Sequence, residues 1–239
     1  MFCRYDLRTT DPDAARRFYR DVLGWELVVG ESQAAPPPIA VWLLHEQARA
    51  RGAPAHWLGA IGVTDVEASV RRLLELGSER LGPTVQARDG STYATLRDPG
   101  GAVVALRSSG EKPRSAAVAW HQLHTRDVER SWSVYSGLFG WKHTQTVDVP
   151  EPEGGHRAFA WDDSGKSVGA MANTARAPGV HAHWLYFFPV GELDAALATV
   201  RKGGGSVGQQ ATLPNGDRLA GCEDPQGAAF GLLQARSGA

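Results

Sequence analysis

Cysteine, long apolar stretches and net charge are all scarce in this sequence. Its 239 residues include two cysteines, Cys3 and Cys222, which lie far apart and form no CxxC pair. That pattern excludes a disulfide-rich scaffold and favours two reduced thiols in a cytoplasmic protein. No apolar run approaches the roughly 18 residues of a membrane span, and the N-terminus has no apolar signal core. We therefore expect a cytoplasmic protein without a membrane partner.

The charges nearly cancel, which narrows the range of partners. Twenty-five Lys and Arg residues stand against 26 Asp and Glu residues, so the formal net charge is −1. No basic stripe of the kind that binds nucleic acid is present, and we expect no nucleic-acid partner. Hydrophobic residues make up 42% and charged residues 21% of the chain, which is typical of a globular protein with its own core.

The dominant feature of the chain is an internal repeat. Residues 11–25 (DPDAARRFYRDVLGW) return as residues 127–141 (DVERSWSVYSGLFGW), with Asp, Tyr and Trp in register. The offset is constant, because 127 − 11, 135 − 19 and 141 − 25 all equal 116. A long repeat with aromatic residues in register indicates two copies of one domain. We predict a first domain at 1–109, a polar linker at 110–114 and a second domain at 115–239.

Alternation and helix-capping signals divide each copy into two similar halves, each with a strand, a helix and further strands. In the first copy, strands are predicted at 3–9, 25–29, 39–44, 56–63, 84–87, 93–97 and 102–106, helices between Asp11 and Gly24 and at 65–76, and a Pro-rich loop at 32–38. In the second copy, strands are predicted at 118–125, 141–147, 156–161, 168–173 and 183–190, and helices at 127–139 and 193–202.

A second signature repeats near the end of each copy. DPGG at 98–101 matches DPQG at 224–227 with an offset of 126, and HW at 56–57 matches HW at 183–184 with an offset of 127. These offsets exceed the first by about ten residues. The first half of the second copy therefore contains an insertion, which we place in the hairpin region at 148–155.

These motifs resemble those of the vicinal oxygen chelate superfamily, which includes glyoxalase I, the bleomycin-resistance proteins and the extradiol dioxygenases. Both copies carry the opening motif and the DPxG turn, so the resemblance covers nearly the whole chain. WHQL at 120–123 and HWL at 183–185 are similar to a tandem-domain actinobacterial branch of glyoxalase-like proteins. The resemblance implies an α+β fold: two tandem glyoxalase-like domains, each made of two βαβββ modules with curved mixed sheets around a cleft.

Enzymes of this superfamily hold a divalent metal in the cleft, and the resemblance locates the ligand positions in this chain. They correspond to Arg4, Leu58, Ala105, Trp120, Leu185 and Gly231. None of these side chains offers a lone pair that binds such a metal. The chain departs from the family pattern here, and we predict no metal and no cofactor.

Histidines elsewhere do not replace those ligands. His121 and His124 are three residues apart on a predicted strand, so their side chains point to opposite faces. His181 and His183 share a face if their strand begins that early, but no third ligand accompanies them. A metal site built from histidines is therefore not expected.

Strand alternation predicts which residues line the two clefts. In the first copy they are the charged Arg4, Asp6 and Arg8, with Leu58. This set either meets a ligand or satisfies itself as an internal Arg–Asp pair. In the second copy the predicted ligand-binding residues are aromatic or neutral: Trp120, Gln122, His124, Leu185, Phe187 and Gly231. Such a surface suits a flat hydrophobic ligand, unless Trp120 and Phe187 simply fill a collapsed cleft.

Three functions are compatible with these features. The leading hypothesis is a metal-independent small-molecule-binding protein of the glyoxalase/bleomycin-resistance type, which binds an aromatic or polycyclic ligand for antibiotic sequestration or as a carrier of a pathway intermediate. The first alternative is a metal-free enzyme of secondary metabolism (a cyclase, an isomerase or a hydroxylation-assisting protein) with His124 as catalytic acid/base and Gln122 polarising a carbonyl. The second is a metal-dependent lyase or dioxygenase with relocated ligands. The expected partner is a hydrophobic or aromatic small molecule, and the chain is expected to be a monomer or a homodimer.

Overall fold

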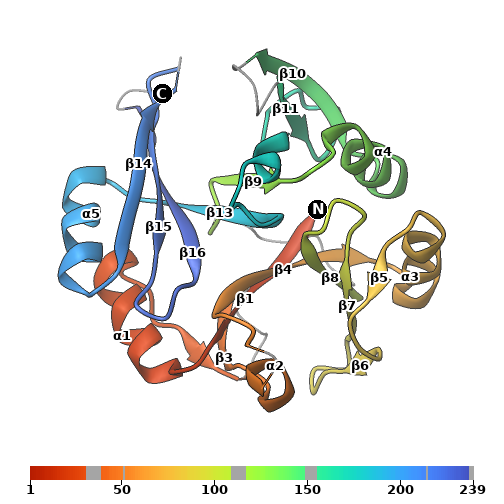
Figure 1. Ribbon diagram of the computed structural model, residues 1–239, viewed down its shortest axis with the longest axis horizontal. Helices are drawn as coiled ribbons and strands as arrows, with labels where there is room; N and C mark the ends of the chain where they lie inside the picture. Colours follow the sequence, from red (N-terminus) through yellow and green to blue (C-terminus); the bar gives the residue numbers. More distant parts are fainter. Residues whose placement is uncertain (31–38, 51, 109–116, 149–154, 214, 237–239) are drawn as a thin grey trace. The chain divides into compact units, whose positions relative to one another are not determined.

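The computed structural model describes residues 1–30, 39–50, 52–108, 117–148, 155–213 and 215–236 (Figure 1). Three features predicted from the sequence lie wholly or mostly outside the described residues: the loop at 32–38, the linker at 110–114 and the insertion at 148–155. In the described part of the chain, no helix has the length and apolar character that a membrane span requires.

The described residues of each copy form strands and helices in the predicted order. The elements of the first copy are β1 (Phe2–Thr9), α1 (Pro12–Leu23), β2 (Val28–Val29), β3 (Ile39–Leu43), α2 (Glu46–Ala50), β4 (His56–Val63), α3 (Val66–Glu75), β5 (Glu79–Arg80), β6 (Val85–Gln86), β7 (Thr92–Arg97) and β8 (Val103–Ser108). Those of the second copy are β9 (Trp120–His124), α4 (Val128–Phe139), β10 (Lys142–Asp148), β11 (Gly155–Ala160), β12 (Gly169–Ala172), the 3-10 helix η1 (Asn173–Arg176), β13 (His183–Pro189), α5 (Leu193–Lys202), β14 (Ser206–Thr212), β15 (Arg218–Glu223) and β16 (Ala229–Gln234).

The strands form two unclosed mixed sheets, one from each copy. The first has the order β2-β3-β1-β4-β8-β7-β5, with β6 paired to β7, and the second has the order β10-β11-β12-β9-β13-β16-β15-β14. Parallel pairs such as β1–β3 and β4–β8 occur beside antiparallel pairs such as β7–β8. The predicted α+β class with two tandem copies is confirmed.

Capping residues set the ends of the first helix of each copy. A side-chain oxygen of Asp11 accepts a backbone hydrogen bond of 2.9 Å, and α1 ends at Gly24 with φ 70°. In α4 the same roles fall to Asp127, with a bond of 3.0 Å, and to Gly140, with φ 69°. A carboxylate satisfies an unpaired N–H group of the first turn, and glycine enters the left-handed region without strain. These helices therefore end within a residue of their predicted limits.

The shortest elements depart most from the sequence predictions. Residues 25–29 contribute only Val28–Val29 to the sheet, and the Trp25 ring packs edge-on against Phe188 with centroids 4.9 Å apart. The two-residue β5, the five-residue α2 and the four-residue η1 are too short to show a period, and they were not predicted. Strands β14 and β15 were also missed, and β14 is exposed along nearly its whole length, so it lacks alternation.

By their contacts, the residues of the chain divide into two compact units, and each unit combines parts of both copies. The first unit comprises the described residues of 1–4, 59–114 and 121–185. The second unit comprises those of 5–58, 115–120 and 186–239. Helices α3 and α4 pack together in the first unit, and α1 and α5 in the second (Figure 1).

A buried network in each unit joins a tyrosine of one copy to the DPxG aspartate of the other. In the first unit the Tyr135 hydroxyl donates to Asp98 at 2.8 Å, and Trp184 Nε1 donates to that hydroxyl at 3.1 Å. The second unit repeats the network with Tyr19, Asp224 and Trp57, at 3.3 and 2.9 Å. Burial raises the pKa of both carboxyl groups. The two copies therefore complete each other's cores.

Candidate functional site

The predicted site residues are divided between the two units. Arg4, Gln122, His124 and Leu185 belong to the first unit. Asp6, Arg8, Leu58, Trp120, Phe187 and Gly231 belong to the second. Each unit therefore brings together a different set of the predicted side chains.

In the first unit, one face of the sheet around β9 combines polar side chains with a floor of alanines. Gln122 pairs with Ala170 and His124 with Ala172 across the parallel β9–β12 pair, and Ala158 on β11 pairs with Ala170. Directly paired residues project to the same side of a sheet. We call this set of five residues the β9 face. Because the three alanine side chains are single methyl groups, they occupy little space beside the Gln122 amide and the His124 imidazole.

His124 on the β9 face is held by two neighbours. Its Nδ1 lies 2.5 Å from the Thr174 hydroxyl, and its ring stacks on His183 with centroids 4.6 Å apart and an interplanar angle of 22°. Burial, with added repulsion from His183 and His156, lowers the pKa of His124 to about 3. The imidazole is therefore neutral at physiological pH.

His183 was not among the predicted site residues, yet its ring stacks on that of His124. Its Nδ1 lies 2.8 Å from the carbonyl oxygen of His181. A carbonyl only accepts, so Nδ1 carries the proton and Nε2 keeps its lone pair. Burial lowers the pKa of His183 as well. Strand β9 lies beside β13 in the sheet, and this neighbourhood, which no local pattern reveals, brings the two histidines together.

His121 lies on the opposite face of β9, as alternation predicts. Its ring stacks on Phe2 with centroids 5.2 Å apart and an interplanar angle of 7°, and its Nδ1 donates to the Val168 carbonyl at 2.9 Å. Burial lowers its pKa to about 4. His121 is therefore a core residue of the first unit.

In the second unit, Phe187 occupies the space of a missing side chain. Phe187 on β13 pairs with Gly231 on β16. A Cβ atom built on Gly231 would lie 2.2 Å from Cδ1 of Phe187, which is far inside van der Waals contact. The phenyl ring thus lies against the glycine backbone, and Phe187 is only 5% exposed. The absence of a side chain at residue 231 is a requirement of this packing.

Elsewhere in the second unit, the charged residues predicted for the first copy largely satisfy one another. Arg8 Nη2 lies 3.4 Å from Asp6 Oδ2, and the Arg8 guanidinium lies over the Trp42 ring at 5.1 Å from its centroid. Burial, with a smaller contribution from the Arg8 charge, lowers the pKa of His56. Leu58 is buried on β4. Trp42 was not among the predicted site residues. It lies on β3, directly opposite Arg8 on β1, and this pairing explains the contact.

The residues at the family's metal positions do not fit a divalent ion. In the structure Arg4, Leu58, Ala105 and Leu185 are all buried, and Ala105 is paired with Ala60. Within the described residues, no group of three or more His, Cys, Asp or Glu side chains is arranged to hold a metal. Stacked imidazoles such as His124 and His183 direct their in-plane lone pairs side by side rather than toward one point. No catalytic step through such an ion follows from this donor set.

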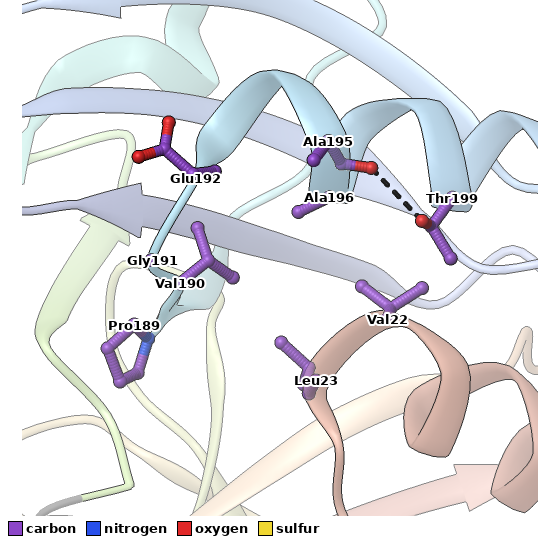
Figure 2. A pocket seen from close by; sticks show the side chains of 9 residues that line it. All are labelled: Val22, Leu23, Pro189, Val190, Gly191, Glu192, Ala195, Ala196 and Thr199. Atoms are coloured by element: carbon purple, nitrogen blue, oxygen red, sulfur yellow. Dashed lines mark hydrogen bonds between the residues drawn. The ribbon is translucent and has the colours of Figure 1, made fainter.

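A separate hollow of about 340 Å³ lies in the second unit between α1 and the start of α5 (Figure 2). Val22 and Leu23 face it from α1, and Pro189 and Val190 from the end of β13. Glu192 is its one charged lining residue. It contains none of the predicted site residues, and its side chains offer little specific chemistry.

Each copy matches a known sequence family, and both families agree with the resemblance that the motifs indicate. Residues 4–106 match the family described as "Glyoxalase-like domain". Residues 117–232 match "Glyoxalase/Bleomycin resistance protein/Dioxygenase superfamily". The chain belongs to the vicinal oxygen chelate superfamily, and its two glyoxalase-like domains stand in tandem as the sequence predicts.

The chain is similar in sequence to several named proteins, at identities between 26% and 35%. The Mycobacterium tuberculosis (strain CDC 1551 / Oshkosh) protein named "Putative glyoxylase CFP32" is 27% identical over 252 residues, 96% of this chain and 92% of that protein. "Anthracycline biosynthesis protein DauV" of Streptomyces sp. (strain C5) is 35% identical over 130 residues, 48% of this chain and 46% of that protein. "Anthracycline biosynthesis protein DnrV" of Streptomyces peucetius is 26% identical over 196 residues, 78% of this chain and 68% of that protein.

Solved structures share the fold at lower identity. The 2,3-dioxygenase LapB from Pseudomonas sp. KL28 has a TM-score of 0.65 at 12% identity, covering 98% of this chain and 91% of LapB. The Mn(II)-bound glyoxalase from Novosphingobium aromaticivorans has a TM-score of 0.63 at 14% identity, covering 98% of this chain and 81% of that glyoxalase. At these identities the likeness concerns the fold.

Proposed function

We propose that this chain is a metal-independent binding protein for an aromatic or polycyclic small molecule. The observation that carries the proposal is the contact between Phe187 and Gly231, because the family's late-strand metal ligand would stand at residue 231. A carboxylate there has neither a side chain to carry it nor space to enter. The other positions hold an arginine, an indole, two leucines and an alanine, none of which binds a divalent metal, and this favours binding by shape and hydrogen bonds over Lewis-acid chemistry.

The β9 face supports the same proposal from the first unit. Its three alanines are buried and apolar, and Gln122 and His124 add an amide and a neutral imidazole to the same face. Ligand sites combine a mostly apolar lining with a few polar groups that fix orientation. The two polar side chains would orient the oxygen atoms of a flat ring system.

The names of two relatives favour a polycyclic ligand. DauV and DnrV are named as anthracycline biosynthesis proteins, and an anthracycline is a molecule with fused aromatic rings. By analogy, we place this chain in secondary metabolism, as the carrier of a polycyclic intermediate or as a protein that sequesters the product. Trp120, the half-buried first residue of β9, is proposed as a stacking surface for such rings.

The electrostatics of His124 favour binding over acid–base catalysis. A general base works best when its pKa is near the working pH. The pKa of His124 is lowered to about 3, chiefly by burial, so its lone pair is weakly basic. The imidazole can orient a ligand through a hydrogen bond without taking its proton, which places a metal-free enzyme second to a binding protein.

Tryptophan fluorescence tests the proposal directly. The protein, with its eight tryptophans, is titrated with anthraquinone-2-sulfonate, and saturable quenching is expected. Cholate, which is polycyclic but neither flat nor aromatic, should not bind. Trp120→Ala should weaken binding up to about tenfold through loss of ring stacking. Trp132→Ala on α4 is the matched control and should leave the affinity unchanged.

Elemental analysis of the purified protein provides the second test. The affinity should not change after treatment with a chelator, and no metal should be present in stoichiometric amount. Absence of saturable quenching by the anthraquinone, or loss of binding on chelation with recovery on adding back one metal, would overturn the proposal.

A further inference from the structure

The pair formed by His124 and His183 in the first unit defines a specific hydrogen-bonding surface. The rings are nearly parallel, with centroids 4.6 Å apart. Each ring is anchored through Nδ1, to the Thr174 hydroxyl in one case and to the His181 carbonyl in the other. The anchors leave Nε2 of both rings pointing away from the groups that hold them, because the two nitrogens lie on different sides of an imidazole.

The anchor of His183 fixes what its Nε2 can do. Since Nδ1 donates to a carbonyl, the neutral ring carries no proton on Nε2, and that atom is an acceptor. Among the described residues, no side chain donates to Nε2 of His183. Burial, with repulsion from His181, lowers the pKa of His183, and burial with repulsion from His183 and His156 lowers that of His124, so both rings are held neutral.

An acceptor of this kind selects among ligand groups. A carboxylate or phosphate offers only lone pairs, which Nε2 of His183 would repel. A divalent metal needs converging ligands, which a stacked pair does not supply. A hydroxyl donates, and a phenolic hydroxyl is both a good donor and coplanar with the ring that carries it. Ala170 and Ala172 beside His124 are buried, whereas the His124 and His183 rings are both partly exposed, so the acceptor lies where a ligand hydroxyl can approach it.

We infer that His124 and His183 form a neutral imidazole pair that accepts a hydrogen bond from a phenolic hydroxyl, so that the chain selects hydroxylated polycyclic aromatics over their unhydroxylated counterparts. This inference rests on the proposed function, since it names the chemical group of the ligand to which the binding site forms a hydrogen bond. His183 Nε2 is the acceptor, and the stacked His124 holds the His183 ring in place.

The test compares two probes that differ only in their hydroxyl groups. Anthraquinone-2-sulfonate and its dihydroxy derivative, alizarin red S, share the ring system and the sulfonate. The wild-type chain should bind alizarin red S about tenfold more tightly, the size of one net hydrogen bond. His183→Phe keeps a flat ring for stacking and removes Nε2, so it should abolish the preference and leave the affinity for the parent probe unchanged. His143→Phe on β10 is the matched control, since His143 is exposed, and a phenyl ring can keep its edge contact with Trp132 while losing the 3.0 Å hydrogen bond to Thr146.

The possible outcomes separate this inference from the proposed function. Equal affinity of the wild-type chain for both probes overturns the inference and leaves the proposed function standing. Binding of neither probe overturns both. A preference that persists in folded His183→Phe also overturns the inference.

A measurement on the unaltered chain covers the case in which the variant does not fold. With ¹⁵N-labelled histidine, Nε2 of His183 should resonate as an unprotonated nitrogen. Its signal should move toward lower frequency when alizarin red S is added and stay in place with the parent probe. A protonated Nε2, or an identical response to both probes, would overturn the inference.

Discussion

Tyr135 donates a 2.8 Å hydrogen bond to the buried carboxylate of Asp98, and these two residues come from different copies of the repeat. The same relationship, with the copies exchanged, joins Tyr19 to Asp224 at 3.3 Å. Each carboxylate also caps its own turn, for Asp98 through a 2.8 Å bond from the Ala102 N–H group. A turn in one copy is therefore stabilised by a helix in the other.

Removing the hydroxyl of Tyr135 should destabilise the first unit. Tyr135→Phe leaves a buried carboxylate without its donor and Trp184 Nε1 without its acceptor. The expected loss in the free energy of unfolding is about 1–3 kcal/mol, measured by urea denaturation. Tyr93→Phe on β7 removes a hydroxyl from a half-buried residue and is the control, with a change of about 0.5 kcal/mol or less. Equal effects of the two changes would contradict the importance of this network.

The stability of the chain should fall between pH 6.5 and about pH 4 in part because of His121. Its pKa drops from 6.5 to about 4 on folding, so the unfolded state binds a proton more readily in that range. The stability that the neutral ring contributes is therefore complete above pH 6.5 and is lost as the pH falls to about 4. The total is about 3 kcal/mol at 1.36 kcal/mol per unit of pKa.

The control for this pH dependence is the variant His121→Phe, which keeps an aromatic ring against Phe2. It should be less stable at pH 7, because the Val168 carbonyl loses the imidazole donor and keeps only the backbone N–H donor of residue 121, but its stability should change less with pH. Asp98 and Asp224 act with the opposite sign, because their raised pKa values add stability as the pH falls. Only the difference between wild type and variant isolates His121, and parallel pH profiles would contradict the assignment.

Glycine is required at residue 231 but not at the neighbouring residue 221. Gly231→Ala places a methyl group 2.2 Å from the Phe187 ring and should destabilise the chain by about 1–3 kcal/mol. Gly221 is paired with Gly231 on β15, and a Cβ atom there would have nothing within 4 Å, so Gly221→Ala should be nearly neutral. Thermal unfolding of both variants measures the contrast. Adding Phe187→Ala to Gly231→Ala should recover part of the loss relative to the sum of the single changes, because the clash is gone.

A fragment comprising residues 1–109 should not form a stable monomer. It retains Tyr19 and Asp98 but lacks Asp224 and Tyr135, their partners from the second copy. Size-exclusion chromatography should show self-association or aggregation, while coexpression with residues 115–239 should yield a complex. A monomeric fragment with cooperative unfolding would contradict this expectation.

The sequence predicts the elements of this fold better than their pairing. Asp11 and Gly24 mark the ends of α1 through local rules of capping, and α5 has the predicted limits at Leu193 and Lys202. The repeat shows that both copies contain a tyrosine helix and an aspartate turn. It does not show that each tyrosine bonds to the turn of the other copy, since that depends on how distant helices and strands pack.

The same limit applies to the candidate site. Alternation places Gln122 and His124 on one face of β9, and the register with β12 agrees. His183 was missed because its ring meets His124 across 59 residues of chain, a distance that follows from the sheet order rather than from a local motif. The contact of Phe187 with Gly231 had a signal, since a bulky residue paired with a glycine often lies over it, but only the register of β13 and β16 makes the pairing visible.

Tyr19 and Tyr135 each bond to the aspartate turn of the other copy, and this constrains how the gene can change. A substitution in the helix of one copy alters the environment of a turn in the other copy, 37 residues away for Tyr135 and 205 residues away for Tyr19, so the two halves must diverge together. A chimaera that joins the first copy of one relative to the second copy of another would pair each tyrosine helix with an aspartate turn from a different protein, so the packing around both contacts would be mismatched.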